Sequence, residues 1–312
     1  MTAQVSAESV LARLVALAHE RGQQPELLMT RYAVERLLYR LSISAHRERF
    51  VLKGALLFDL WFDQAHRPTR DADLLGYGDA DAAMMVAVFG DIADIEVDDA
   101  VQFDSWNLAV VETREQANYP GLRVRLLARM AQARFIVQVD IGFGDAIAEP
   151  PDVVDFPCLL TGMPAPRLRV YPKESVLAEK LHILTQLGIA NSRLKDYYDL
   201  WTLGQQADFD FVSTAQAVAA TFARRATKLA ERVPIGLEAE FANDPAKQAQ
   251  WRGFLKRTGL QAPSLVEVVS YLAGFLGPLV LASSDRHQGL VWRDGGPWRP
   301  SPQPKRNARE SP

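Results

Sequence analysis

The order of strand-like and helix-like segments constrains the fold of this chain most strongly. Before Pro172, stretches with β-type alternation stand among amphipathic helices, whereas after Pro172 only helical periodicity continues. This order predicts the α+β class, with a mixed sheet in residues 1–172 and a helical domain in residues 173–290. Residues 291–312 are rich in proline and polar side chains, so we expect a disordered tail there.

The spacing of apolar residues predicts the individual elements. Helical spacing occurs in residues 6–22, 25–43, 54–63, 80–94, 173–187, 193–205, 212–232, 244–257 and 264–283. Strands are predicted at 67–78, 107–112, 121–129, 134–143, 154–160 and 167–171. The segment 134–143 alternates clearly, so one of its faces is expected to carry Ile136, Gln138 and Asp140.

Composition excludes several classes of protein. No apolar run is long enough to cross a bilayer, so no membrane association is expected. Cys158 is the single cysteine, which excludes an internal disulfide and a cysteine zinc site and favours a cytoplasmic protein. The five histidines are scattered without a ligand spacing, which disfavours a metal-dependent hydrolase.

Charge is unevenly distributed along the chain. Residues 71–113 contain eleven acidic side chains and no lysine or arginine, and they are followed by Arg114, Arg123, Arg125, Arg129 and Arg134. This order can place metal-binding carboxylates beside phosphate-binding cations. It is equally consistent with two oppositely charged, solvated faces.

The segment from Lys53 to Asp73 carries the clearest chemical pattern. Asp71 and Asp73 stand two apart in a predicted strand, so their carboxylates point to one face. There they can share magnesium ions, which prefer oxygen ligands and also bind nucleotide phosphates. Gly54 begins a predicted helix, where a missing side chain would admit phosphate to the backbone N–H groups, and Lys53 can neutralise phosphate charge. An isolated Asp-x-Asp pair, however, is also common in surface turns.

Asp140 is the predicted third carboxylate. Nucleotidyl transfer with two metal ions commonly uses a carboxylate on a neighbouring strand, and Asp140 lies in an apolar strand where an unpaired charge is costly. Alternatively, Asp140 faces solvent on an edge strand or pairs with an arginine such as Arg125. Asp145, just beyond this strand, is the weaker candidate.

The helical half adds a lysine and two aspartates. Lys180 lies among apolar residues of segment 173–187, where its ammonium can reach a triphosphate or simply extend to solvent. Asp196 and Asp199 are one helical turn apart, next to Arg193 and Lys195. They can bind or orient functional groups, or form an ordinary cap with i,i+3 ion pairs.

Four blocks of sequence resemble the AbiEii/AbiGii toxin family, nucleotidyltransferases of the DNA polymerase β superfamily that include the MenT-type bacterial toxins. Within residues 30–285, these blocks are VLKGALLFDLWF…RPTRDADL, VDIGFGD, PKESVLAEKLHIL and RLKDYYDLW. The resemblance implies a polymerase-β-like nucleotidyltransferase core, followed by a helical half that completes the active site. Ala55 departs from the lysine-glycine-glycine that the family often has.

The resemblance also implies a function. The chain would be the toxin of a toxin–antitoxin or abortive-infection pair, with a cognate antitoxin protein as partner. MenT-type relatives use a nucleoside triphosphate and magnesium to add nucleotides to the 3′ end of tRNA. We therefore expect an NTP substrate, a tRNA or other RNA acceptor, and Mg²⁺ as the cofactor, with Mn²⁺ as the alternative ion.

The expected site residues follow from these blocks and from the residue chemistry. Gly54, Thr69, Asp71, Asp73, Lys180 and Asp196 match positions of the family pattern. We expect a catalytic role for Asp71, Asp73, Lys180 and Asp196. Nucleotide binding is expected from Lys53, Gly54, Thr69 and Arg70, and metal binding from Asp71, Asp73 and Asp140. An RNA backbone would lie on the basic residues of segment 212–232, namely Arg224, Arg225, Lys228 and Arg232.

Two other functions stay open at this point. The same chemistry could modify a protein or a small molecule instead of RNA. The chain could also be a non-catalytic binding protein that keeps the fold, although the intact Asp71, Asp73 and Asp140 argue against this. The four basic residues at 224–232 could equally form a solvated helix face.

Overall fold

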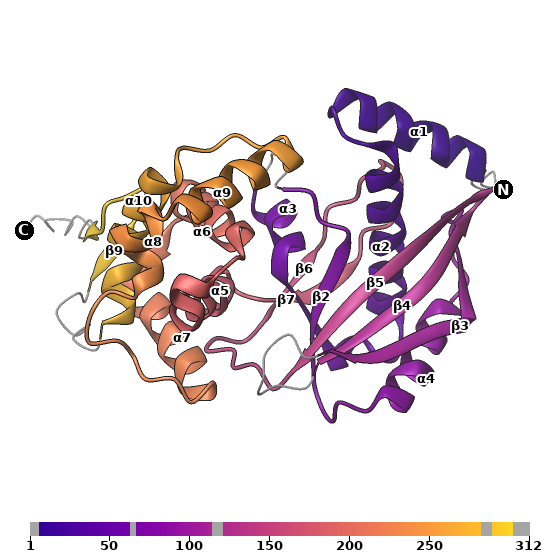
Figure 1. Ribbon diagram of the computed structural model, residues 1–312. Helices are drawn as coiled ribbons and strands as arrows, with labels where there is room; N and C mark the ends of the chain where they lie inside the picture. Colours follow the sequence, from indigo (N-terminus) through magenta and orange to yellow (C-terminus); the bar gives the residue numbers. More distant parts are fainter. Residues whose placement is uncertain (1–5, 63–66, 114–120, 282–288, 302–312) are drawn as a thin grey trace, which may run out of the picture. The chain divides into compact units, whose positions relative to one another are not determined.

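The computed structural model describes residues 6–62, 67–113, 121–281 and 289–301 of the chain (Figure 1). The chain divides into two compact units, residues 1–172 and residues 173–312. Each unit has its own hydrophobic core, which contains Leu28 and Val139 in the first unit and Leu181 and Leu272 in the second. No helix in these described ranges is long and apolar enough to cross a membrane.

The N-terminal unit is built on a seven-stranded mixed sheet with the strand order β3-β4-β5-β2-β1-β7-β6. Its strands are β1 (Phe50–Lys53), β2 (Asp71–Gly76), β3 (Gln102–Thr113), β4 (Gly121–Met130), β5 (Ala133–Phe143), β6 (Asp152–Asp155) and β7 (Arg167–Val170). The pairs β2–β5 and β1–β7 are parallel, and the other neighbours are antiparallel. The strands that carry Lys53, the Asp71–Asp73 pair and Asp140 therefore lie side by side in the sheet.

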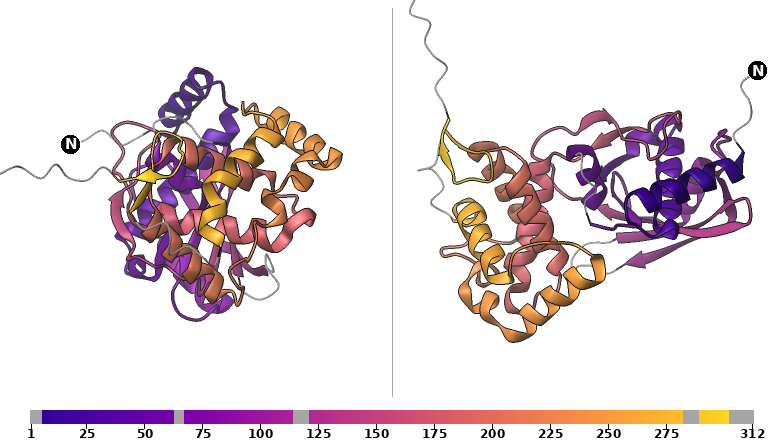
Figure 2. Two further views of the ribbon diagram at one scale, coloured as in Figure 1. Left: turned by 90° about the vertical axis from the view of Figure 1, so that its left-hand side faces the viewer. Right: turned by 90° about the horizontal axis from the view of Figure 1, so that it is seen from above.

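Helices cover one face of this sheet. Helix α2 (Pro25–Ile43) packs on β5, α4 (Ala82–Ala93) packs on β3, and α1 (Ala7–Glu20) lies against α2 (Figure 2). Alternate residues of β4 and β5 point to these helices, and Val124, Val137 and Val139 are accordingly buried. The residues between them point to the opposite face, where Ile136 is 58% exposed.

The segment after β1 is less regular than its sequence suggests. The 3₁₀ turn η1 (Arg47–Arg49) leads into β1, which is followed by the 3₁₀ turn η2 (Gly54–Leu57) and the short helix α3 (Phe58–Trp61). The predicted helix at 54–63 is therefore two short turns up to Trp61, and residues 63–66 lie outside the described ranges. The predicted strand at 67–78 is limited to Asp71–Gly76.

The C-terminal unit is helical. It contains α5 (Lys173–Leu187), η3 (Gly188–Ala190), α6 (Leu194–Gln206), α7 (Phe211–Arg224), η4 (Ile235–Leu237), α8 (Ala239–Asn243), α9 (Pro245–Thr258) and α10 (Leu265–Val280). Helix α5 packs on α7, and α6 packs on α10. The predicted α+β class, with a mixed sheet followed by a helical half, is confirmed.

Two parts of the C-terminal unit differ from expectation. Helix α7 ends at Arg224 instead of near residue 232, because Ala226 adopts a left-handed backbone with φ 49°. The N–H of Thr227 donates to the carbonyl of Phe222, and that of Ala226 donates to the carbonyl of Ala223. These two bonds form a Schellman cap, in which glycine is the usual left-handed residue, so the sequence carries no stop signal.

The expected disordered tail is the second difference. Strands β9 (Leu290–Trp292) and β10 (Arg299–Pro300) form a small sheet with β8 (Phe209–Asp210). Trp292 is buried with its ring centroid 4.4 Å from that of Phe275, and Trp298 donates its indole N–H to the carbonyl of Phe275. The expectation of disorder is therefore wrong for residues 291–301, because aromatic burial outweighs the proline-rich composition, and residues 302–312 lie outside the described ranges.

Candidate active site

Three adjacent strands place Lys53, Asp73 and Asp140 in one row across the sheet. Lys53 is the register partner of Asp73 between β1 and β2, and Asp73 is the partner of Asp140 between β2 and β5. Asp71 lies two residues before Asp73, on the same face, opposite Gln138. Pairing of the strands thus brings together residues that are up to 87 positions apart in the chain, from Lys53 to Asp140.

Gly54 leaves room for the carboxylate of Asp73. A Cβ atom on residue 54 would lie 2.1 Å from Oδ2 of Asp73, and the φ of +77° at Gly54 also favours glycine. Gly54 begins only the four-residue turn η2, which is too short to present a helix dipole to phosphate. Glycine is therefore needed at position 54 for a reason other than the expected one, namely to leave room for the carboxylate of Asp73.

The ammonium group of Lys53 lies between two partners. Its Nζ donates to Oδ2 of Asp145 at 2.5 Å and lies 5.6 Å from the ring centroid of Tyr171. The side chains of Lys53 and Asp145 are 14% and 11% exposed. Asp145, the weaker candidate for a metal ligand, thus holds Lys53 beside the carboxylate row.

Arg123 of β4 orients Asp140 through two hydrogen bonds. Its Nε donates to Oδ1 at 2.7 Å, and its Nη2 donates to Oδ2 at 3.0 Å, while the amide of Gln138 donates to Oδ2 at 3.3 Å. Strand β5 lies between β4 and β2, so the alternative of a solvent-facing edge strand is wrong. The alternative of an arginine partner is realised, but the arginine is Arg123, because Arg125 stands opposite Gln138.

The chemistry of these carboxylates fits a magnesium ion. Magnesium takes oxygen ligands, and in nucleotide sites one or two carboxylates suffice because phosphates and water complete its shell. Asp71 and Asp73 offer such a pair. Within the described ranges, no three acidic, histidine or cysteine side chains already converge on one point. A contribution of Asp140 therefore requires one of its oxygens to be shared between Arg123 and the ion.

Thr69 and Arg70 directly precede β2. Thr69 is half-buried and Arg70 is exposed. They therefore lie at the N-terminal end of β2, next to Asp71. Their contact with a nucleotide stays a prediction.

In the C-terminal unit, Lys180 of α5 is held by two aspartates of α6. Its Nζ lies 2.8 Å from Oδ1 of Asp196 and 2.7 Å from Oδ2 of Asp199, and neither aspartate has exposed surface. The Nε of Arg193 reaches the other oxygen of Asp196 at 2.6 Å, which is the i,i+3 pair considered above. Because Asp196 is fully buried, it positions Lys180 and Arg193 and does not present open oxygens to a ligand.

These charges keep Asp196 ionised. Burial alone would raise the pKa of Asp196, but Lys180 and Arg193 outweigh burial, so the pKa of this carboxyl lies below its usual value. Helical spacing places Asp199 one turn from Asp196 but does not identify a partner for it. Its role as a second partner of Lys180 depends on the packing of α5 on α6, which helical spacing does not reveal.

The basic residues expected to face RNA do not share a helix face. Arg224 ends α7, and Lys228 and Arg232 follow that helix. The Nη1 of Arg225 lies 3.3 Å from Nδ1 of the buried His182, whose Nε2 lies 2.8 Å from the hydroxyl of Thr227. Arg225 therefore packs against α5, and the alternative of one solvated helix face is wrong. RNA binding by these residues stays a prediction.

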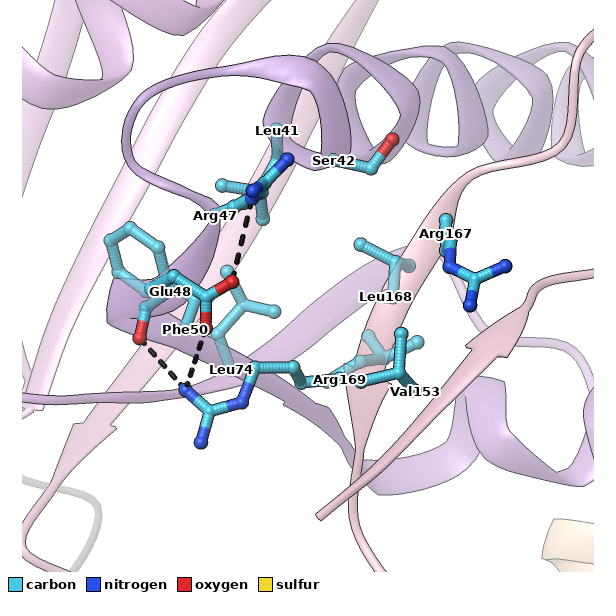
Figure 3. Close-up of a pocket in the computed structure, with 11 residues that line it drawn as sticks. Leu41, Ser42, Arg47, Glu48, Phe50, Leu74, Val153, Arg167, Leu168 and Arg169 are labelled. Atoms are coloured by element: carbon cyan, nitrogen blue, oxygen red, sulfur yellow. Dashed lines mark hydrogen bonds and ion pairs between the residues drawn. The ribbon is translucent and has the colours of Figure 1, made fainter.

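A cavity of about 260 Å³ lies elsewhere in the N-terminal unit (Figure 3). Leu41 of α2 and Phe50 of β1 contribute to its apolar lining, and Arg47 and Arg169 contribute charge. The cavity lies on the helix-covered side of the sheet, and none of the predicted site residues lines it. It is therefore separate from the carboxylate row.

Comparison with known proteins identifies the family of the chain. The family model for the nucleotidyl transferase AbiEii toxin of type IV toxin–antitoxin systems matches residues 36–273, which include all four sequence blocks quoted above. The comparison with curated proteins gives no match.

Two crystal structures from Helicobacter pylori are similar to this chain. JHP933 has 14% sequence identity and a TM-score of 0.45, over 79% of this chain and 88% of its own. A structure described as a nucleotidyltransferase has 15% identity and a TM-score of 0.43, over 79% of this chain and 91% of its own. The family assignment rests on the match to residues 36–273. The chain belongs to the AbiEii family of nucleotidyltransferase toxins from type IV toxin–antitoxin systems.

Proposed function

We propose that this nucleotidyltransferase transfers a nucleoside monophosphate from an NTP to the 3′-hydroxyl of an RNA, with the 3′ end of tRNA as the acceptor. The row formed by Lys53, Asp73 and Asp140 carries this proposal, together with Asp71 on the same face. Carboxylates beside a lysine suit a substrate that brings both a metal ion and a triphosphate.

The metal site of this proposal consists of Asp71, Asp73 and Asp140. Mg²⁺, or Mn²⁺ in its place, would neutralise phosphate charge and activate the attacking hydroxyl when bound. The 3′-hydroxyl of the acceptor gives its proton to solvent as its oxygen forms a bond to the α-phosphorus. The bond from that phosphorus to the α,β-bridging oxygen breaks, and pyrophosphate leaves with that oxygen. Positioning and electrostatic stabilisation are the main contributions of the protein to such a transfer.

The roles of the other residues follow from their contacts. Lys53, held by Asp145 at 2.5 Å, would place a positive charge on the triphosphate. Gly54 keeps the carboxylate of Asp73 in place, and Arg123 keeps that of Asp140 in place. Thr69 and Arg70 would bind phosphate at the start of β2.

The proposal for the C-terminal unit is separate. We assign Lys180 to charge neutralisation on the nucleotide and Asp196 to holding Lys180, supported by their 2.8 Å contact. We also assign residues 1–172 to the catalytic core and residues 173–290 to a helical domain that contributes Lys180. The family implies an antitoxin partner, and we place the protein in the cytoplasm.

Label transfer to different acceptors tests this function. Each of the four NTPs, labelled at the α-phosphate, is incubated with the enzyme and either tRNA or total cell protein, with and without Mg²⁺. The expected result is Mg²⁺-dependent label on tRNA that is lost in Asp71→Ala and Asp140→Asn. Label on protein but not on RNA would overturn the proposed acceptor, and full transfer by Asp71→Ala would overturn the proposed site.

A further inference from the structure

The open face of β4 and β5 continues from Asp140 as a basic track. The pairing of these strands is regular, so every second residue shares the face of Asp140. Along this face Arg123 stands opposite Asp140, Arg125 opposite Gln138, Leu127 opposite Ile136, and Arg129 opposite Arg134. From Arg123 to Arg129 the track extends over about 20 Å at the usual rise of a strand.

The side chains of this track are accessible. Arg125, Arg129 and Arg134 are exposed, and Ile136 is 58% exposed. Arg129 lies 3.3 Å from Asp104, whereas Arg125 and Arg134 form no ion pair within the part of the chain that the structure describes. The track therefore offers positive charge next to the carboxylate row, and its apolar members separate the cations.

An exposed tryptophan lies on the neighbouring strand. The pairing of β3 with β4 is interrupted between Asp104, opposite Leu127, and Ala109, opposite Arg125. Trp106 falls in this irregular stretch and is 96% exposed, the most exposed large apolar side chain in the described ranges. Burial of an indole in a core is favourable, so full exposure beside a basic track suggests a ligand with a flat aromatic group.

We infer that this face, defined by Arg125, Arg134 and Ile136, binds the single-stranded 3′ segment of the acceptor RNA together with the exposed Trp106 of the adjoining strand β3. The inference rests on the proposed transfer to RNA and names the surface that guides the acceptor. Arg125 and Arg134 contact phosphates, Trp106 stacks on a base, and the 3′ end points toward Asp140. Positive charge combined with an exposed aromatic ring is the pattern by which proteins bind single strands.

Binding of a labelled oligonucleotide tests the surface directly. The probe is a fluorescein-labelled single-stranded RNA of about twelve nucleotides with a free 3′-hydroxyl, a length within the site sizes of single-strand binders. Its Kd is measured by fluorescence anisotropy at several NaCl concentrations for wild type, Arg125→Glu, Arg134→Glu and Trp106→Ala. Arg47→Glu is the matched control, because Arg47 is 63% exposed and lies on the helix-covered side (Figure 3).

The expected result is specific to the track. Each arginine reversal should raise the Kd for the RNA on the order of tenfold and lower the salt slope by about one. Trp106→Ala should raise the Kd about fivefold or more. Arg47→Glu should stay within about twofold of wild type, as should the KM for NTP in all variants. Unfolding midpoints equal to that of wild type would show that the variants are folded.

Several outcomes would overturn the inference. One is unchanged RNA binding in Arg125→Glu and Arg134→Glu. Another is a loss that is larger for duplex RNA than for the single strand. A third is that the two arginine substitutions weaken binding of polyglutamate and leave binding of RNA unchanged, which would make the face a site for an acidic protein. Label transfer to RNA that survives in both variants with an unchanged acceptor KM would refute this surface while the proposed function stands. Wild type that transfers no label to RNA would refute the proposed function.

Discussion

Gly54 and Asp73 fit together so closely that a Cβ atom on residue 54 would lie 2.1 Å from Oδ2 of Asp73. Gly54 lies next to Asp73 because it directly follows Lys53, the residue of β1 that pairs with Asp73 of β2. The absence of a side chain at 54 and its φ of +77° thus fix one carboxylate of the proposed metal site.

Gly54→Ala should therefore displace Asp73. We expect nucleotidyl transfer to fall about 100-fold, the size of effect that a misplacement of about 1 Å can cause. We also expect a loss of about 1–2 kcal/mol in the free energy of unfolding from the left-handed backbone. Gly78→Ala is the control, since Gly78 has φ +94° but no atom within 4 Å of its Cβ position. Equal loss of transfer in both variants, measured as initial rates, would show that backbone strain alone explains the effect.

Lys180→Met should destabilise the C-terminal unit. The change leaves the buried Asp196 and Asp199 without their shared cation, and breaking a buried pair costs about 3–5 kcal/mol. Lys195→Met removes an exposed lysine of the same helix as the aspartates and should cost less than about 0.5 kcal/mol. Urea unfolding at pH 7 measures both. The additional change Asp199→Asn should recover part of the loss, and equal effects of the two lysine variants would contradict the described cluster.

His182 should make the stability depend on pH. Burial and the neighbouring Arg225 lower the pKa of His182 to about 4, and its ring accepts from Arg225 at Nδ1. Between about pH 6.5 and pH 4 the unfolded chain binds this proton and the folded chain does not, so stability falls as the pH falls. The contribution is on the order of 3 kcal/mol over this window. Urea unfolding at several pH values should show a smaller slope for His182→Gln than for wild type, whereas identical slopes would exclude a neutral, buried His182.

Ala226→Gly should stabilise the protein. Ala226 holds the left-handed position of the cap that ends α7, where glycine avoids a cost of about 1 kcal/mol. Ala219→Gly, at an exposed position inside the same helix, should instead destabilise by about 1 kcal/mol. Thermal and urea unfolding compare the two variants. A destabilising Ala226→Gly would mean that α7 continues past Arg224.

The sequence predicted those features that depend on local pattern. Helix α2 was predicted at its observed bounds, 25–43, because its apolar residues recur at helical spacing. The alternation of β5 correctly separated the buried Val137 and Val139 from the exposed Ile136. The two-residue period of a strand also placed Asp71 and Asp73 of β2 on one face of the sheet.

Features that depend on strand pairing could not be predicted in this way. The partner of Asp140 is set by the turn between β4 and β5, where Ala131 has φ 50° in place of the glycine or asparagine that usually marks such a turn. Because no glycine or asparagine marks the turn, the register between β4 and β5 could not be predicted from the sequence. Arg125 was therefore named as the arginine partner of Asp140 in place of Arg123. The proximity of Lys53 to Asp73, and of Lys180 to Asp199, likewise depends on contacts between elements that are distant in the chain.

The position of the label within the NTP shows whether the row of Lys53, Asp73 and Asp140 transfers a nucleotidyl group. Wild type, Asp73→Asn and Gly78→Ala are incubated with tRNA, Mg²⁺ and an NTP that carries the label either on the α- or on the γ-phosphate. We expect wild type and Gly78→Ala to transfer the α-label to the 3′ end of the tRNA and to release the γ-label as pyrophosphate, and we expect Asp73→Asn to do neither. Transfer of the γ-label to the acceptor, or undiminished α-label transfer by Asp73→Asn, would contradict it.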